Sequence, residues 1–127
     1  MKTLVATALL LGFLAPAQAL DITDLRPGAY VAHASDGKLS CEWLASAAEM
    51  TFDGHNFSGH YAICRSERLK APHRFRHTCL EAQGEHQPKL SDIDTSPDKE
   101  TFESTIVVKT PKSFRYNGDL YSFCAGL

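Results

Sequence analysis

The stretch that decides the fold is SFRYNGDLYSFC, residues 113–124, near the end of the chain. Asn117-Gly118 lies between two runs rich in aromatic residues, and both residue types tolerate the positive φ angles of a two-residue hairpin turn. Such a turn sets the register, so Phe114 is expected opposite Tyr121. The stretch therefore predicts an antiparallel β-hairpin.

The aromatic residues of this hairpin fall on one face: Phe114, Tyr116, Tyr121 and Phe123. One interpretation is an aromatic platform for a sugar or a peptide. The favoured interpretation is a core face of cross-strand aromatic pairs, because a chain of this length needs its aromatic side chains inside.

Three further stretches have strand patterns. Asp36-Gly37 and Asp53-Gly54 each lie between extendable runs and predict hairpins. Residues 101–110, TFESTIVVKT, alternate in hydropathy, which places Phe102, Ile106 and Val108 on one face with Ser104. We therefore expect a mainly β fold, a small antiparallel meander or barrel-like domain.

The stretch APHRFRHTCLEAQGE, residues 71–85, fits two structures. As a strand it places Phe75 and Cys79 on one face. As a short helix near residues 72–83, it has Pro72 in its first turn and Gly84 after its end. The polar segment that follows is expected to be a long surface loop.

The first 19 residues have the pattern of a secretory signal peptide. Lys2 precedes an apolar run of roughly a dozen residues, which ends in the small residues Ala17-Gln18-Ala19. We expect residues 1–19 to be removed and residues 20–127 to form a single β-rich domain. No later segment is apolar enough to span a membrane, so the expected location is the periplasm or the extracellular space.

All four cysteines lie after the expected cleavage site: Cys41, Cys64, Cys79 and Cys124. An even number in a small exported domain predicts two disulfides. Three pairings are possible, and the sequence does not choose among them. We favour Cys64–Cys79, which closes a local loop, together with Cys41–Cys124, which ties an early segment to the last strand.

The richest chemistry lies in PHRFRHTC, residues 72–79. Between Arg65 and His77 a single acid, Glu67, accompanies five basic residues: Arg65, Arg68, Lys70, Arg74 and Arg76. Guanidinium groups bind carboxylates and phosphates through paired donors. The candidate site is therefore an anion-binding strip formed by Arg65, Arg68, Arg74 and Arg76, with His73 and His77 adding charge in mild acid. The alternative is that the acid-rich segment from Glu81 to Glu103 neutralises the strip.

Metal binding is a further interpretation. His73 and His77 suit one metal ion only if they lie on a helix, and they then need a third ligand such as His55 or His86. Five residues also match the spacing of a calcium loop: Asp92, Asp94, Ser96, Asp98 and Glu103. Pro97 stands where such a loop needs glycine, which makes the match weak.

Composition and motifs narrow the function. The chain carries a net charge of −2, which argues against a nucleic-acid binder. No nucleophile elbow, phosphate-binding loop or HExxH motif is present. We expect an exported, non-catalytic binding or inhibitory module for a protein or an anionic ligand, with no cofactor. The alternatives are a metal-binding protein and a small hydrolase.

Overall fold

The computed structural model describes residues 20–44, 46–85 and 87–125. The expected signal peptide, residues 1–19, lies outside the described residues, as does His86. Within the described part of the chain, no helix combines the length and the apolar character needed to cross a bilayer.

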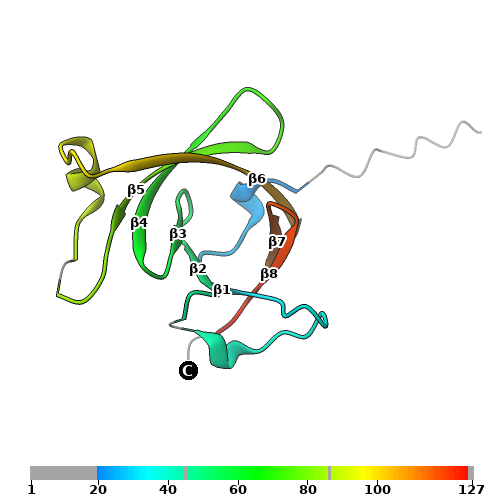
Figure 1. Cartoon of the computed structure of the whole chain (residues 1–127). Coiled ribbons are helices and arrows are strands. Elements are labelled where there is room, and N and C mark those ends of the chain that lie inside the picture. Colours follow the sequence, from blue (N-terminus) through cyan, green and yellow to red (C-terminus); the bar gives the residue numbers. More distant parts are fainter. Residues whose placement is uncertain (1–19, 45, 86, 126–127) are drawn as a thin grey trace, which may run out of the picture.

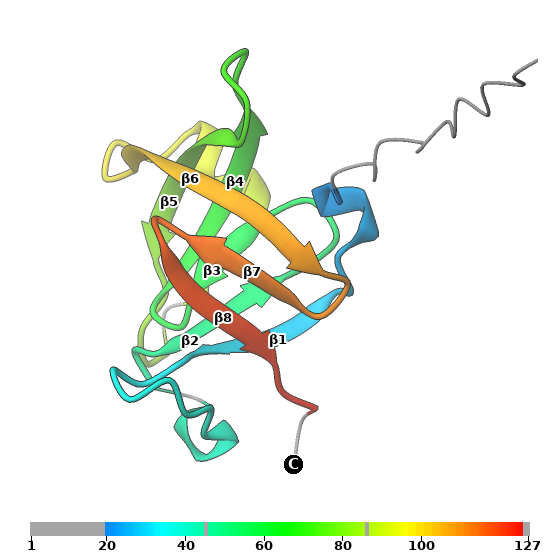
Figure 2. The same cartoon turned by 90° about the vertical axis from the view of Figure 1, so that its right-hand side faces the viewer.

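Eight antiparallel strands form one sheet that curves into a nearly closed barrel (Figures 1 and 2). The strands are β1 (Gly28–Ala32), β2 (Glu49–Phe52), β3 (Phe57–Gly59), β4 (Ala62–Arg68), β5 (Arg74–Glu81), β6 (Glu100–Thr110), β7 (Ser113–Tyr116) and β8 (Asp119–Phe123). Three short 3-10 helices lie in the connections: η1 (Ile22–Asp24), η2 (Cys41–Trp43) and η3 (Leu90–Asp94). The expectation of a mainly β, barrel-like fold is confirmed.

The sheet follows the chain in the order β3-β2-β1-β8-β7-β6-β5-β4, so β8 pairs with β1 and the two ends of the sheet are β3 and β4. These two strands meet at a seam that side chains bridge. The Phe57 amide donates to Ser66 Oγ at 2.9 Å, and the Cys64 amide donates to Ser58 Oγ at 2.9 Å. The Ser66 amide donates to Asn56 Oδ1 at 2.8 Å. Side-chain oxygens thus satisfy edge amides that would otherwise lack partners.

The last hairpin has the expected register. Phe114 lies opposite Tyr121 and Tyr116 lies opposite Asp119. Asn117 has φ 48° and Gly118 has φ 91°, the left-handed angles that a two-residue turn of this type requires. The prediction from residues 113–124 is confirmed.

The aromatic face of this hairpin packs inward. Phe114 is fully buried, and Tyr116, Tyr121 and Phe123 pack against the core around it. Burial raises the pKa of both tyrosine hydroxyls, Tyr116 and Tyr121. The structure therefore favours a core face over an exposed platform. The central core residues come from six of the strands and from the segment before β1: Leu25, Tyr30, Met50, Phe52, Phe57, Phe75, Ile106, Val108 and Phe114.

The stretch that fitted a helix or a strand is strand β5. Its side chains alternate over most of its length, with Phe75 and His77 buried between more exposed neighbours, and Cys79 and Leu80 are both buried. The strand pairs on both sides, with β4 and with β6. The alternative of a short helix near residues 72–83 is wrong, because the backbone groups of β5 serve two neighbouring strands.

Of the two hairpins predicted at Asp-Gly pairs, the described residues form one. Asp53-Gly54 lies in the turn of the β2–β3 hairpin, where Phe52 faces Phe57, as expected. Asp36-Gly37 also forms a turn, closed by the Gly37 amide donating to the Ala34 carbonyl at 2.8 Å. The described residues between that turn and β2 contain η2 and no strand, and β1 instead pairs with β2 and β8. The expected hairpin at Asp36-Gly37 is therefore wrong.

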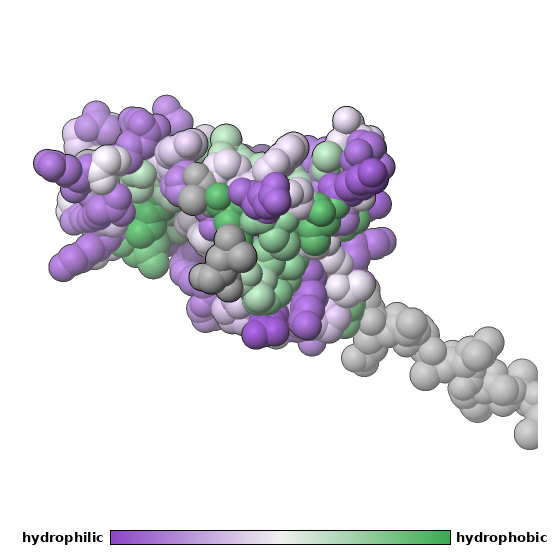
Figure 3. Space-filling model, turned by 90° about the horizontal axis from the view of Figure 1, so that it is seen from below, coloured by the Kyte–Doolittle hydropathy of each residue, from purple (hydrophilic) through white to green (hydrophobic). Residues whose placement is uncertain are grey.

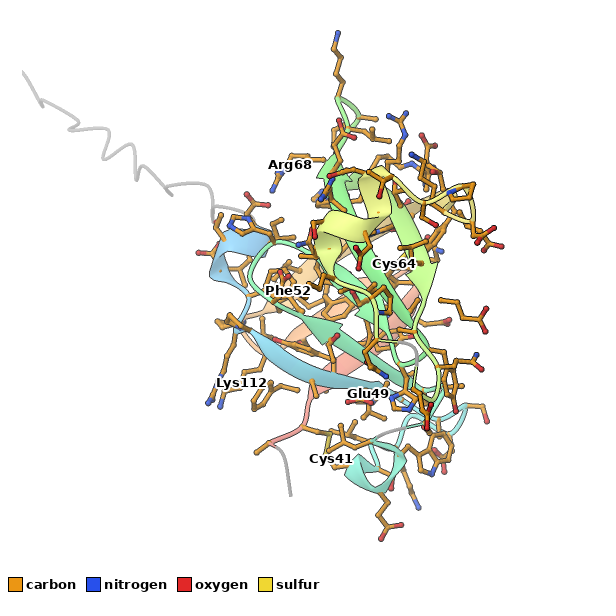
Figure 4. The ribbon with its side chains drawn as sticks, turned by 90° about the vertical axis from the view of Figure 1, so that its left-hand side faces the viewer. Cys41, Glu49, Phe52, Cys64, Arg68 and Lys112 are labelled. Carbon is orange, nitrogen blue, oxygen red and sulfur yellow. A yellow bond between two sulfur atoms is a disulfide. The ribbon has the colours of Figure 1, made fainter. Side chains whose placement is uncertain are left out.

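Two disulfides hold the fold, and they have the favoured pairing: Cys64–Cys79 and Cys41–Cys124. Cys64 and Cys79 face each other directly across β4 and β5. Cys41–Cys124 attaches η2 to the end of β8, near the bottom of the molecule in Figure 4. Two intramolecular disulfides suggest an oxidising extracellular or periplasmic environment.

Candidate functional site

The four arginines of the predicted strip all lie on the hairpin formed by β4 and β5. We call Arg65, Arg68, Arg74 and Arg76 the arginine surface. Three of them are exposed and Arg74 is half-buried. Figure 4 shows Arg68 near the upper end of β4, with Cys64 lower on the same strand. The four arginines thus share one strand pair, and Arg68 lies over the ring of the buried Phe75, 5.5 Å from its centroid.

Each arginine of this surface lies against an acid from another part of the chain. Arg65 forms an ion pair with Asp94 of η3, and its second terminal nitrogen donates to the Leu90 carbonyl at 3.1 Å. Arg68 Nη2 lies 2.5 Å from Asp21 Oδ1. The hydrogen bond from Arg68 lowers the pKa of the Asp21 carboxyl.

The two arginines of β5 share one acid on β6. Arg74 donates to Glu103 Oε2 at 3.1 Å and to Thr105 Oγ1 at 2.9 Å. Arg76 is held more loosely, with terminal nitrogens 3.6 Å from Glu103 Oε1 and 3.9 Å from Glu67 Oε2. The arginine surface is therefore a charge-balanced network rather than a basic patch.

The two histidines of the predicted strip are separated. His73 is exposed in the turn before β5, where it has φ 61°. His77 is 1% exposed and faces the interior of the barrel. Since β5 is a strand, the helical spacing that would place both imidazoles on one metal ion is absent. His77 does not lie on the exposed surface with the arginines.

His77 is part of a polar contact inside the core. Ser66 Oγ lies 2.7 Å from His77 Nδ1, and Ser104 Oγ lies 2.6 Å from His77 Nε2. The rings of Phe57, Phe75 and Phe102 surround the imidazole. Burial lowers the pKa of His77 to about 4, because a charged imidazole is poorly solvated there. The group is therefore neutral in mild acid.

A second region of interest lies at the other end of the same strand pair. Two cavities of ≈ 640 Å³ and ≈ 840 Å³ share Tyr61, Ala62 and Pro88 in their walls. We call the two together the Tyr61 groove. Its side walls are the start of β4 and the loop between β5 and β6, which projects on the left in Figure 1.

Tyr61 is the main exposed aromatic residue of this groove, with 47% of its surface accessible. It lies in the turn between β3 and β4, and its carbonyl accepts from the Ala82 amide at 2.9 Å. The His60 ring packs against it, with centroids 4.6 Å apart. Seen from below, a hydrophobic patch lies between hydrophilic surfaces at the left of the molecule, the side on which the loop projects (Figure 3).

Metal binding gains no support from the described ranges, which contain no group of three or more His, Cys, Asp or Glu residues placed to hold an ion. Two members of the calcium-like pattern bind arginines instead. Asp94 pairs with Arg65, and Glu103 pairs with Arg74. Asp92 accepts from the Lys89 amide at 2.7 Å, at the start of η3.

Sequence reasoning missed both the interior position of His77 and the Tyr61 groove. A signal for the first was present, since His77 alternates in phase with Phe75 and Cys79 on the inward face. The groove depends on where a long loop lies against β4, and no local pattern in the sequence encodes that position. The chain matches no protein-family model, no curated protein and no solved structure.

Proposed function

We propose that this protein is an exported, non-catalytic binding module that recognises another protein through the Tyr61 groove. One observation carries the proposal: an exposed aromatic ring lies at the junction of two cavities on a strand pair held by a disulfide. Exposed aromatic side chains in concave sites are frequent anchors of protein interfaces. The signal-peptide pattern and the two disulfides support export.

The interior position of the serine–histidine contact supports binding rather than hydrolysis. A nucleophilic serine needs a base and access to substrate. Ser66 lies within hydrogen-bond distance of His77, but His77 and Ser104 are buried among aromatic rings. We therefore treat this contact as part of the core.

Site-specific photo-crosslinking tests the proposal. p-Benzoylphenylalanine replaces Tyr61 in one variant and Phe102 in the other, since Phe102 has a similar exposure of 44% and lines neither cavity. Each variant is irradiated in extracellular or envelope extract from the source organism. We expect one protein, identified by mass spectrometry, to crosslink at position 61 and not at position 102. That protein is then purified and titrated against the unmodified chain.

The crosslinking result has a clear negative outcome. Equal crosslinking at both positions would show non-selective contact with the surface. No crosslink at position 61, with titratable partners found at position 102, would place the binding surface elsewhere. Either result rejects the Tyr61 groove as the recognition site.

A second candidate function is binding of an anionic ligand at the arginine surface. Arg76 favours it, because the Arg76 guanidinium makes no hydrogen bond within the described part of the chain and meets its two acids at 3.6 Å and 3.9 Å. A carboxylate or phosphate with well-placed oxygens would displace Glu67 and Glu103. His73 remains part of this proposed surface.

Titration with inorganic phosphate and with a glutamate-rich peptide tests this second candidate. The Arg74→Ala/Arg76→Ala variant should bind either probe more weakly, and the difference should shrink at high salt because exposed charges are screened over ~8 Å at physiological ionic strength. Equal affinity of the variant and the unmodified protein at low salt would end this interpretation.

A further inference from the structure

The walls of the Tyr61 groove are acidic. The first cavity is lined by four carboxylates, Glu81, Asp92, Asp98 and Glu100. The second adds Glu49 and Asp53. Among the described residues, the lining of the two cavities includes no lysine or arginine, and its one histidine, His60, contacts Glu49 at 3.0 Å.

Three of these carboxylates form no ion pair within the described part of the chain. Glu81, Asp98 and Glu100 are exposed, and their side chains make no ion pair or hydrogen bond with the residues that the structure describes. On the arginine surface, by contrast, each carboxylate lies against a guanidinium. The groove therefore keeps a negative potential that attracts cations.

The groove also offers an aromatic ring and an apolar floor. Tyr61 stands between the cavities, and Ala62, Leu80 and Pro88 contribute apolar surface. A cationic side chain is attracted to the face of an aromatic ring, and its methylene groups cover apolar surface. The Tyr61 ring and the carboxylates thus suit the cationic group of a lysine or arginine side chain, and the apolar residues suit its methylene groups.

The shape favours a polypeptide over a small cation. The cavities of ≈ 640 Å³ and ≈ 840 Å³ extend on both sides of Tyr61, which is far more space than a metal ion fills. In Figure 4 this side of the molecule runs from Cys64 to Glu49, two residues of the second cavity on different strands. An extended segment can place successive side chains along such a surface.

We propose that the Tyr61 groove docks a basic segment of a partner protein, with a lysine or arginine over Tyr61 and its charge against Glu81, Asp98 and Glu100. The proposal rests on the proposed function and specifies the chemistry of the partner. Charge complementarity selects this occupant over an acidic or a neutral segment.

Fluorescence anisotropy with three labelled peptides tests the proposal on the full mature chain. One peptide alternates glycine with arginine, one alternates glycine with glutamine, and one alternates glycine with glutamate. We expect the arginine peptide to bind at least about tenfold more tightly than the other two at moderate salt, a difference of about 1.4 kcal/mol. Spermidine, added at the same concentration of positive charge as the arginine peptide, should displace that peptide poorly, because it has no polypeptide backbone to lie along the groove.

Matched charge variants locate the binding. The groove variant is Glu81→Gln/Asp98→Asn/Glu100→Gln, and the control variant is Asp36→Asn/Glu42→Gln/Asp119→Asn, which makes the same change in net charge outside both cavities. The groove variant should lose about tenfold in affinity for the arginine peptide, and the control variant less than about twofold. Tyr61→Ala should weaken binding with the net charge unchanged.

The outcomes separate this inference from the proposed function. Equal losses in the groove and control variants would show a general charge effect and overturn the inference. Tighter binding of the neutral or acidic peptide, sensitive to Tyr61→Ala, would overturn the basic partner and keep the groove as a binding site. Efficient competition by spermidine would replace the protein segment by a small polyamine. No binding of any peptide, with no crosslink at position 61, would overturn both proposals.

Discussion

The arginine surface and the Tyr61 groove share the strand pair β4 and β5 and adjoin where Arg65 donates to Leu90, a residue of the groove, but they differ in how their charges are balanced. At one end every arginine lies against an acid, and the pairs join η1, η3 and β6 to the hairpin. At the other end three exposed carboxylates, Glu81, Asp98 and Glu100, form no ion pair with the residues that the structure describes. The densest charge run of the sequence therefore produces the more neutral surface.

This difference shows that a run of like charges in the sequence does not predict the electrostatic potential of the surface on which those residues lie. The acid-rich segment after β5 supplies both regions. Asp94 and Glu103 point to arginines on β4 and β5, and Glu100 lines the groove. Which carboxylate serves which region depends on the path of the loop between β5 and β6.

Among changes at the two regions themselves, the largest effect should follow from removing the disulfide Cys64–Cys79. Cys64→Ala/Cys79→Ala should lower the free energy of unfolding by about 3 kcal/mol, because the loop it closes is short, with a sequence separation of 15. Cys64 and Cys79 also line the groove, so groove binding should weaken with stability. Urea denaturation and peptide titration measure the two effects.

The matched control is the other disulfide. Cys41→Ala/Cys124→Ala opens a loop with a sequence separation of 83 and should cost roughly 4–5 kcal/mol by the same chain-entropy estimate. Neither cysteine lines the groove, so the folded fraction of this variant should keep its groove affinity. Loss of affinity in both variants would show that the groove depends on overall stability alone.

The next effect concerns the buried histidine beneath the arginine surface. The pKa of His77 is about 4 in the folded protein and should be near 6.5 when unfolded. Between these values the unfolded state binds more protons, so the stability present above pH 6.5 is lost as the pH falls towards 4. The loss should reach about 2 kcal/mol by pH 5.

Urea denaturation at pH 7.5 and pH 5 measures this loss. The His77→Gln variant keeps a polar side chain but cannot titrate, so its stability should differ less between the two pH values. An equal drop in the variant and the unmodified protein would assign the acid sensitivity to other groups.

A smaller effect on the free energy of unfolding is expected from breaking an ion pair of the arginine surface. Glu103→Gln removes the acid that Arg74 and Arg76 share. These pairs are exposed, so the cost should be about 0.5–1 kcal/mol at low salt and smaller at high salt. Thermal unfolding at two salt concentrations measures it. A cost that is independent of salt would point to packing rather than charge.

The smallest effect on the free energy of unfolding is expected from removing a carboxylate of the Tyr61 groove. Glu81→Gln removes a carboxylate that contacts no base in the described part of the chain, so the free energy of unfolding should change by less than about 0.5 kcal/mol. The comparison with Glu103→Gln, made by the same method, is the decisive one. A larger loss for Glu81→Gln would reveal a partner in the groove and reverse the contrast between the two ends.

Local patterns were sufficient where neighbours in sequence decide the structure. Asn117-Gly118 predicted the turn and the register of the last hairpin, because a two-residue turn leaves one choice of pairing. Asp36-Gly37 predicted a turn that forms but not a strand beyond it. There, the segment after residue 37 leads into η2 instead of pairing with β1. The disulfide Cys41–Cys124 attaches η2 to the residue after β8.

The candidate site was harder to predict because its contacts join distant segments. Arg68 and Asp21 are 47 positions apart, and Arg65 and Asp94 are 29 apart. The alternation of residue types along β4 and β5 does not predict which distant acids pair with their arginines. His77 was predictable in principle, since a strand that buries Phe75 and Cys79 also turns residue 77 inward.

The seam between β3 and β4 has a consequence for aggregation. Both strands are edges of the sheet, and an unpaired strand edge is a template for pairing with another molecule. Asn56, Ser58 and Ser66 occupy the edge amides that such pairing would use. We therefore expect these three small polar side chains to oppose edge-to-edge association of the protein, although they contribute little to its core.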